Sequence, residues 1–226
     1  MSNLVIAIDG PAGAGKSTVA KLLARDLGLT YLDTGAMYRA IALKARRAGL
    51  GPTDGEAAAK IGDDSVISFG VGDPQPVFLD GEDVTSAIRL PEIGELASAL
   101  SAFTPVRRVL VERQKALIGR GGVVLEGRDA TTVIAPSAQV KVYLTASLDE
   151  RAKRRHLELE GKGLPSAIET VRDEVETRDH RDMNREDSPL MVAPDAIVVE
   201  SAGHTPTQVA EKIKELIPAA FRAIKT

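Results

Sequence analysis

Cysteine is missing from this chain of 226 residues, and aromatic residues make up only 3% of it. Without cysteine there can be no disulfide, no cysteine-ligated metal and no thiol nucleophile. The three histidines, at positions 156, 180 and 204, do not have the spacing of metal ligands. So few aromatics also disfavour a protein that binds single-stranded nucleic acid, because such proteins stack bases on aromatic rings.

The chain also lacks an excess of positive charge, with a formal net charge of -3 and a sequence pI near 5.7. Because phosphate-rich surfaces attract basic proteins, we expect neither a nucleic-acid partner nor a membrane partner. No apolar stretch is long enough to span a bilayer, and the N-terminal residues carry no charged flank or cleavage signal. The expected location is therefore cytoplasmic. Nothing in the sequence demands a dimer, so a monomer is expected.

What the chain does contain is an alternation of short apolar runs with helical patterns. Runs of this kind are typical of strands buried in a parallel sheet. They lie at residues 4–8, 31–32, 123–125, 140–144 and 196–199. A glycine-rich segment follows the first run, and from Lys16 apolar residues recur at helical spacing up to Gly28, a typical C-terminal cap. The pattern predicts the α/β class, with a three-layer core around a central parallel sheet.

Three further helices have recognisable first residues. Thr104 and Thr205 are each followed by proline, and a hydroxyl residue followed by proline is typical of a helix N-terminus. Ser147, with Glu150 three residues later, fits a capping box. For the helix that begins at Thr104, the expected inward-facing residues are Val106, Val109, Leu110 and Leu117.

Two segments interrupt the alternation of strands and helices. Residues 62–88 contain strand-like runs at 66–69, 76–79 and 84–85, with Asp80-Gly81 as a hairpin signal. Residues 151–185 are highly charged and helical, and a glycine-containing turn at 161–163 would fold them into a mobile hairpin. The expected parts are a core of residues 1–61, 90–150 and 188–226, an inserted acceptor-side β lobe of residues 62–89, and a helical lid of residues 151–187.

The glycine-rich segment matches the phosphate-binding pattern G-x-x-x-x-G-K-[ST], between a strand and a helix as that pattern requires. Its backbone N–H groups and the helix N-terminus would surround the β- and γ-phosphates of ATP. Lys16 would neutralise charge on the transferred group, and the Ser17 hydroxyl would bind the Mg2+ that accompanies ATP. A merely flexible turn would not need lysine and serine in the first helical turn. The predicted ATP-binding residues are Gly10, Pro11, Ala12, Gly13, Ala14, Gly15, Lys16, Ser17 and Thr18.

A phosphate-binding loop alone leaves several protein classes open, because switch GTPases, motor ATPases and small-molecule kinases share it. The chain has no Asn/Thr-Lys-x-Asp run that would read guanine. An arginine-rich lid favours a kinase that closes over a small phosphorylated acceptor. The alternatives are a kinase for another metabolite, such as shikimate, gluconate or dephospho-coenzyme A, and a nucleotide-binding switch that acts through a protein partner.

Five segments along the chain narrow this choice. They are Ile8-Asp9-Gly10-Pro11, Asp33-Thr34-Gly35-Ala36-Met37-Tyr38-Arg39, Leu79-Asp80-Gly81-Glu82-Asp83-Val84-Thr85, Glu126-Gly127-Arg128-Asp129 and Arg178-Asp179-His180-Arg181-Asp182-Met183-Asn184-Arg185. Together, over essentially the whole chain, they resemble the bacterial-type cytidylate kinase family of P-loop nucleoside monophosphate kinases. The resemblance implies transfer of the γ-phosphoryl group of ATP to CMP or dCMP, which gives CDP or dCDP and ADP.

The resemblance also implies which arginines hold the phosphate of the acceptor. Here they are Arg39, Arg128 and Arg185. A guanidinium group suits this work because its planar fork meets a phosphate bidentately and never loses its charge. The simpler alternative for each is a solvated surface arginine, the usual place of this residue type.

Cytosine, by the same resemblance, would be read by Ser98, Arg107 and Asp129. A carboxylate facing the exocyclic amine would reject uracil, which has a carbonyl at that place. Asp129 has alternatives as a strand-end cap or a magnesium neighbour, and Ser98 as an ordinary buried hydroxyl. The ribose contacts correspond to Arg178 and Asp182, whose spacing also fits an ordinary ion pair along a helix.

The remaining implied residues lie in the lid and beside the acceptor. Arg154, Arg155 and Arg181 are candidates to approach the transferred phosphoryl group, although a solvated basic helix would explain them too. Thr34, where serine is also common in the family, joins the CMP-binding set. Glu126 stands where aspartate is common, so it is given no metal role. The predicted catalytic residues are Lys16, Arg128, Arg181 and Arg185.

Overall fold

The computed structural model describes residues 3–119 and 121–222, which fall into two compact units. The first unit comprises the chain up to residue 32, residues 118–184 and the chain from residue 188 onward. The second unit comprises residues 33–117 and 185–187.

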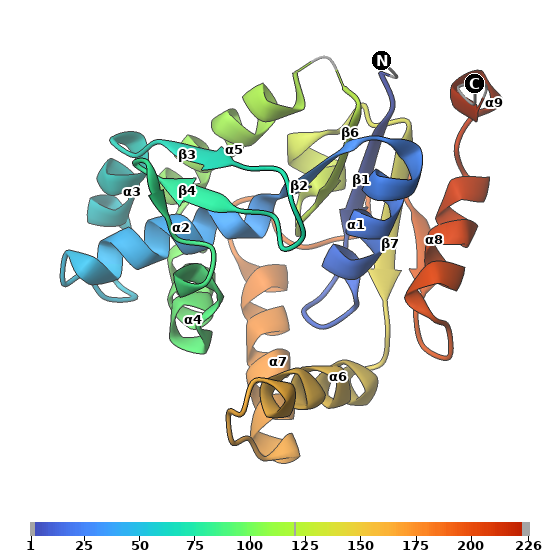
Figure 1. Cartoon of the computed structure of the whole chain (residues 1–226). Coiled ribbons are helices and arrows are strands. Elements are labelled where there is room, and N and C mark those ends of the chain that lie inside the picture. Colours follow the sequence, from blue (N-terminus) through green and yellow to red (C-terminus); the bar gives the residue numbers. More distant parts are fainter. Residues whose placement is uncertain (1–2, 120, 223–226) are drawn as a thin grey trace. The chain divides into compact units, whose positions relative to one another are not determined.

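A five-stranded parallel sheet forms the centre of the first unit (Figure 1). Its strand order is β2-β6-β1-β7-β8, and β1 pairs with β6 and β7 in register, so that Ile8 lies opposite Glu126 and Val142. The strands are β1 Val5–Asp9, β2 Thr30–Asp33, β6 Val123–Glu126, β7 Val140–Thr145 and β8 Ile197–Glu200. Every residue of β1 is buried, as expected for a central strand covered on both faces.

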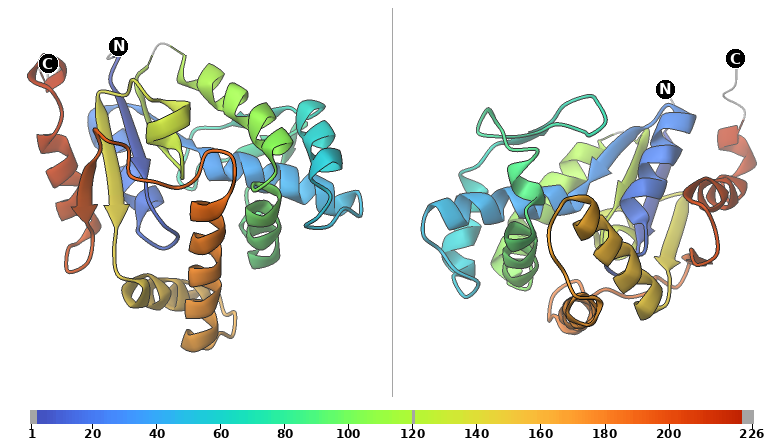
Figure 2. Two further views of the ribbon diagram at one scale, coloured as in Figure 1. Left: turned by 180° about the vertical axis from the view of Figure 1, so that it is seen from behind. Right: turned by 60° about the horizontal axis from the view of Figure 1, so that its bottom comes forward.

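Helices α1 (Lys16–Leu27) and α8 (Pro206–Glu215) pack against each other beside this sheet (Figure 2). Their apolar faces join the strands in one core, in which Leu23 of α1 and Ile213 of α8 are fully buried. Thr205 caps α8 in a complete capping box, and Gly28 ends α1 in the left-handed conformation that glycine adopts without strain. A short helix α9 (Ala219–Arg222) follows α8.

A hairpin of two helices, α6 (Leu148–Gly161) and α7 (Ile168–Asn184), completes the first unit. Ser147 caps α6 by accepting a hydrogen bond from the Glu150 N–H, as the sequence predicts. The hairpin has a small apolar core of its own, made by Leu159, Val171 and Val175. After β6 the chain forms a wide helical turn, η2 (Ala130–Ile134), before β7 begins.

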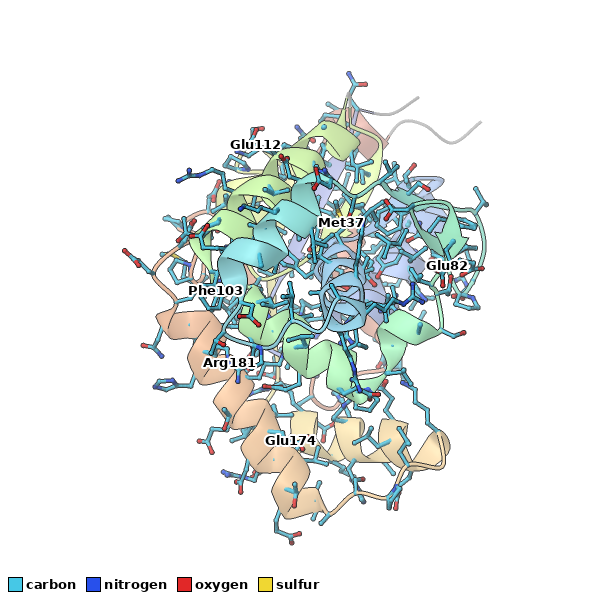
Figure 3. The ribbon with its side chains drawn as sticks, turned by 90° about the vertical axis from the view of Figure 1, so that its left-hand side faces the viewer. Met37, Glu82, Phe103, Glu112, Glu174 and Arg181 are labelled. Carbon is cyan, nitrogen blue, oxygen red and sulfur yellow. The ribbon has the colours of Figure 1, made fainter. Side chains whose placement is uncertain are left out.

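The second unit combines helices with a small antiparallel sheet of order β3-β4-β5. Its buried centre includes Met37, which Figure 3 labels together with Phe103 and Glu82 of the same unit. Phe103 packs against Gly55, where a side chain would collide with the ring. The elements are α2 Thr34–Arg47, α3 Gly55–Asp63, β3 Ile67–Phe69, β4 Val77–Leu79, β5 Glu82–Asp83, η1 Ala87–Arg89, α4 Pro91–Leu100 and α5 Thr104–Ile118.

The predicted α/β class with a central parallel sheet and a small β insertion is confirmed, but some local predictions are wrong. Leu117 does not face inward: it is 47% exposed, because the buried stripe of α5 ends at Gln114. The third strand of the insertion is β5, not residues 84–85, and Val84 is instead a buried residue after it. No helix among the described residues is long and apolar enough to cross a membrane.

Candidate active site

The phosphate-binding loop joins β1 to α1 at the carboxyl edge of the sheet. Gly10, Gly13 and Gly15 all have positive φ angles, of 148°, 76° and 94°, which residues with a Cβ rarely adopt. A Cβ at Gly10 would collide with the carbonyl oxygen of Leu144 on β7. The glycines are therefore required for the loop to curl tightly against the neighbouring strand, with the N-terminus of α1 facing the loop.

Lys16, the first residue of α1, is 5% exposed and folds back over the loop. Its Nζ donates to the carbonyl oxygens of Gly10 and Pro11, at 2.8 Å each. Burial, together with the nearby Arg128 guanidinium, lowers the pKa of Lys16 to about 7. A phosphate placed beside this ammonium group would favour its charged form, so the lysine is poised to take up a negative ligand.

Ser17 donates a hydrogen bond of 2.6 Å from its hydroxyl to Oε1 of Glu126, the last residue of β6. The Tyr31 hydroxyl donates to the same oxygen at 3.3 Å. Glu126 is buried, so its carboxylate is held beside the first turn of α1. These contacts place two oxygen ligands of the kind that Mg2+ prefers, one hydroxyl and one carboxylate, side by side.

Asp9, the last residue of β1, is fully buried and holds the turn that follows β6. Its carboxylate accepts hydrogen bonds from the Ala130 N–H at 2.8 Å, the Thr131 N–H at 2.7 Å and the Thr131 hydroxyl at 2.6 Å. Burial raises the pKa of Asp9, although these hydrogen bonds act in the opposite direction. The carboxylate thereby ties the segment after Asp129 to the strand that leads into the phosphate loop.

Arg128 lies between Glu126 and Asp129, directly after β6, and pairs with α7. Its Nε donates to Oδ2 of Asp182 at 2.8 Å, and its side chain is 17% exposed. Asp129 is buried, and its side chain does not cap η2, which begins at the next residue. Lys16, Arg128 and Asp129 thus lie beyond the carboxyl ends of β1 and β6, and Asp182 of α7 is joined to this edge through its ion pair with Arg128.

The second unit carries the predicted acceptor residues of the α2 region. Thr34 begins α2 and is buried, and Asp33 caps that helix by accepting from the Ala36 N–H at 2.9 Å. Asp33 also pairs with Arg89 at 2.7 Å. The side chains of Asp33 and Arg89 are thereby fixed beside the first turn of α2.

Arg39 of α2 lies against α4, where Gly94 has no side chain and so leaves room for the guanidinium group. Its Nη1 donates to the carbonyl oxygen of Ile88 at 3.2 Å. A Cβ at Gly94 would lie 2.6 Å from that same nitrogen. Gly94, which no local pattern in the sequence singles out, therefore lets the guanidinium of Arg39 lie close to the helix backbone.

Arg107 of α5 is 1% exposed and stacks over the Tyr38 ring, with 5.5 Å from the guanidinium carbon to the ring centroid. Its Nη1 donates to the carbonyl oxygen of Ser101 at 3.3 Å. The Ser101 hydroxyl in turn donates to the carbonyl oxygen of Ser98 at 2.8 Å. Arg107 and Ser98 are therefore brought to one corner of the second unit. Such a fully buried arginine is not an ordinary surface residue.

The arginines predicted to lie in the lid have different partners. Arg154 donates to Glu150, to Ser201 and to the carbonyl oxygen of Ala14 in the phosphate loop. Arg155 pairs with Glu158 at 2.8 Å, one turn further along α6. Figure 3 labels Arg181 on α7, the helix that also carries Arg178 and Asp182. Arg185 is buried and groups with the second unit.

Comparison with known proteins places these residues in a family. The profile of the cytidylate kinase family matches residues 6–219. A cytidylate kinase from Desulfitobacterium hafniense is 47% identical over 214 residues, which is 95% of this chain and 92% of that protein. One from Caldicellulosiruptor bescii is 47% identical over 217 residues, 96% of each chain.

Among solved structures, an uncharacterized protein from Eubacterium ventriosum has a similar fold. The TM-score is 0.53 at 13% sequence identity, and the match covers 95% of this chain and 98% of the other. At this identity the likeness concerns the fold alone.

Proposed function

The chain belongs to the cytidylate kinase family, and from that membership we propose how its residues divide the work of phosphoryl transfer. It is a kinase that phosphorylates CMP with ATP as the phosphoryl donor. This decides against the switch and the other metabolite kinases considered above. The proposal concerns the ATP site, the metal, the acceptor site and the lid.

One observation carries the proposal. Strands β1 and β6 are parallel neighbours, with Ile8 opposite Glu126, so the phosphate loop after β1 and the Arg128 turn after β6 leave the same edge of the sheet. A cradle of backbone N–H groups and a guanidinium group at one edge suit two phosphate-bearing ligands that meet end to end. Ligands of open α/β sheets bind at this carboxyl edge.

On the donor side, residues 10–18 bind ATP and Lys16 neutralises the transferred charge. The attacking phosphate oxygen of CMP is already an anion at neutral pH, so little proton transfer is needed. Catalysis is then positioning together with charge neutralisation in an in-line displacement. Arg128, Arg181 and Arg185 act with Lys16 on the transferred group, and Arg154 and Arg155 are the further lid candidates.

Mg2+ would be held mainly by the ATP phosphates, with Ser17 as the protein ligand and Glu126 beside it. The hydroxyl and carboxylate oxygens that meet at 2.6 Å support this, because Mg2+ prefers oxygen ligands. Among the described residues no cluster of three or more His, Cys, Asp or Glu side chains could hold a metal ion alone. Mg2+ is usually bound through one or two protein groups and the substrate phosphates. When bound, the ion would withdraw negative charge from the β- and γ-phosphates.

On the acceptor side, Arg39, Arg128 and Arg185 hold the phosphate of CMP or dCMP. Ser98, Arg107 and Asp129 read cytosine, while Thr34, Arg178 and Asp182 complete the nucleotide site. The burial of Arg107 and Asp129 supports this, since hydrogen bonds to a base discriminate more sharply in a site that is withdrawn from water. The division into a core, a β lobe of residues 62–89 and a lid of residues 151–187 that closes over both substrates belongs to the same proposal.

For the setting of the reaction we propose a monomer in the cytoplasm, with no nucleic-acid or membrane partner. The slightly negative net charge of the chain supports the absence of a nucleic-acid or membrane partner, because it provides no general attraction to phosphate-rich surfaces.

The base-reading role of Asp129 can be tested by Asp129→Asn. An amide donates to the uracil carbonyl where the carboxylate repels it, so the ratio of kcat/KM for CMP to that for UMP is expected to fall by roughly tenfold or more. Coupled assays of ADP release with each acceptor measure the ratio.

The matched control is Thr132→Val in the same turn, because the Thr132 hydroxyl is buried without a hydrogen-bond partner. We expect it to leave the ratio unchanged. If Asp129→Asn keeps the wild-type ratio, Asp129 does not read the base.

A further inference from the structure

Ala12, in the middle of the phosphate loop, is held on both sides by side chains of the α6–α7 hairpin. Its N–H donates to Oδ1 of Asp179 on α7 at 3.0 Å. Its carbonyl oxygen accepts from Nη1 of Arg151 on α6, also at 3.0 Å. The same Arg151 nitrogen forms an ion pair with Asp179. One ion pair between two helices therefore satisfies both backbone groups of one loop residue.

Packing reinforces these polar contacts. The side chain of Ala12 lies against the apolar core of the hairpin, which is made by Leu159, Val171 and Val175. At the next position, a Cβ on Gly13 would lie 2.9 Å from the carbonyl oxygen of Arg151. The loop backbone therefore runs directly against the first turn of α6, and a glycine is needed for that approach.

The ion pair is almost completely withdrawn from solvent, since Arg151 is 7% and Asp179 6% exposed. Arg151 is further fixed by donating its Nε to the carbonyl oxygen of Ala146, at the end of β7, at 3.0 Å. A buried ion pair adds little net stability, because the loss of hydration offsets the attraction between the charges. The contacts of this ion pair with the Ala12 backbone therefore suggest a role other than stabilising the fold.

The phosphate loop works by presenting backbone N–H groups in a fixed arrangement, and small displacements of such groups weaken both binding and catalysis. We propose that Arg151 and Asp179 are positioning residues: they fix the phosphate loop at Ala12 to the base of the α6–α7 hairpin, so that affinity for ATP depends on the hairpin. This inference rests on the assignment of the ATP site to residues 10–18.

The inference is tested with three variants, Arg151→Met, Asp179→Leu and the two combined. Each single change leaves one buried charge without its partner, and a lower Tm is expected. The double variant removes both charges and is expected to regain most of the lost Tm. It still leaves Ala12 without either partner, so KM for ATP is expected to stay raised by roughly tenfold, while KM for CMP changes by less than about twofold.

The matched control is Arg172→Ala. Arg172 of α7 also pairs with the start of α6, at 2.9 Å from Asp149, but this pair is exposed and does not touch the phosphate loop. Wild-type KM values are expected for it. Isothermal titration of ADP gives a second readout, in which the dissociation constant should rise for the double variant in proportion to KM for ATP.

A double variant with the wild-type KM for ATP would overturn the inference whatever its Tm, because the pair would then not position the phosphate loop. If the double variant does not fold, Asp179→Ala takes its place, because it removes the acceptor of the Ala12 N–H and leaves room for water to hydrate Arg151. A wild-type KM for ATP in that variant would overturn the inference equally. If instead the ATP site itself is wrongly assigned, Lys16→Ala keeps its turnover.

Discussion

Replacing Lys16 by alanine is expected to lower kcat by about 10²–10³-fold, the usual effect of removing one group that stabilises charge in a transition state. The Lys16 Nζ is held at the loop by the carbonyl oxygens of Gly10 and Pro11, where it can follow the transferred phosphoryl group. Folding should survive, because burial already disfavours the charged form of this lysine. Initial rates at saturating ATP and CMP, together with Tm, measure both effects.

The control for this substitution is Arg25→Ala, which removes an exposed cation from the same helix, α1. Its kcat should be that of the wild type. Turnover that persists in Lys16→Ala at more than about a tenth of the wild-type rate would mean that the phosphate loop does not carry the reaction.

Arg128→Met is expected to lower kcat/KM for CMP by about 10²–10³-fold, with a much smaller effect on KM for ATP. The Arg128 guanidinium is the proposed clamp for the acceptor phosphate, and its pairing with Asp182 holds it in place. Arg128→Lys should recover little activity, since an ammonium group cannot form two parallel hydrogen bonds to one phosphate. Steady-state kinetics with one substrate varied at a time separate the two KM values.

Loss of Arg128 also leaves Asp182 as a buried charge, so a lower Tm is expected and activity must be corrected for the folded fraction. Arg108→Ala, at an exposed arginine of α5, is the control for general loss of positive charge. A KM for CMP that stays at the wild-type value in Arg128→Met, or that rises no more than KM for ATP, would contradict the acceptor role.

The phosphate loop could be predicted from the sequence because each of its requirements is local. Glycine is needed where φ is positive, lysine and serine where the helix begins, and an apolar run where the strand is buried, and all of these lie within residues 4–18. The caps at Ser147 and Thr205 were predictable for the same reason, since the donor and the acceptor are three residues apart.

The supporting contacts could not be predicted, because they join residues far apart in the chain. Asp9 meets Thr131 across 122 positions, and Asp179 meets Ala12 across 167. The only local signal that Asp9 has a structural role is its carboxylate at the end of an otherwise apolar strand. The exposure of Leu117 could not be predicted either. Helical spacing identifies a stripe of apolar residues on a helix, but not the residue at which the surface that covers this stripe ends.

Ser17 and Glu126 are an intermediate case. The serine was predictable from the motif, whereas the glutamate is longer than the aspartate common in the family, so its distance from Ser17 could not be predicted. The hydrogen bond of 2.6 Å between them shows that the longer side chain reaches the first turn of α1.

The central claim, that the phosphate loop and Arg128 hold two phosphate-bearing substrates for direct transfer, is tested most directly by following the label of [γ-32P]ATP. With CMP present, the account predicts label in the β-phosphate of CDP, one ADP formed for each CDP, and transfer slowed by about 10²–10³-fold in Lys16→Ala. Label released as inorganic phosphate at a rate independent of CMP would contradict it.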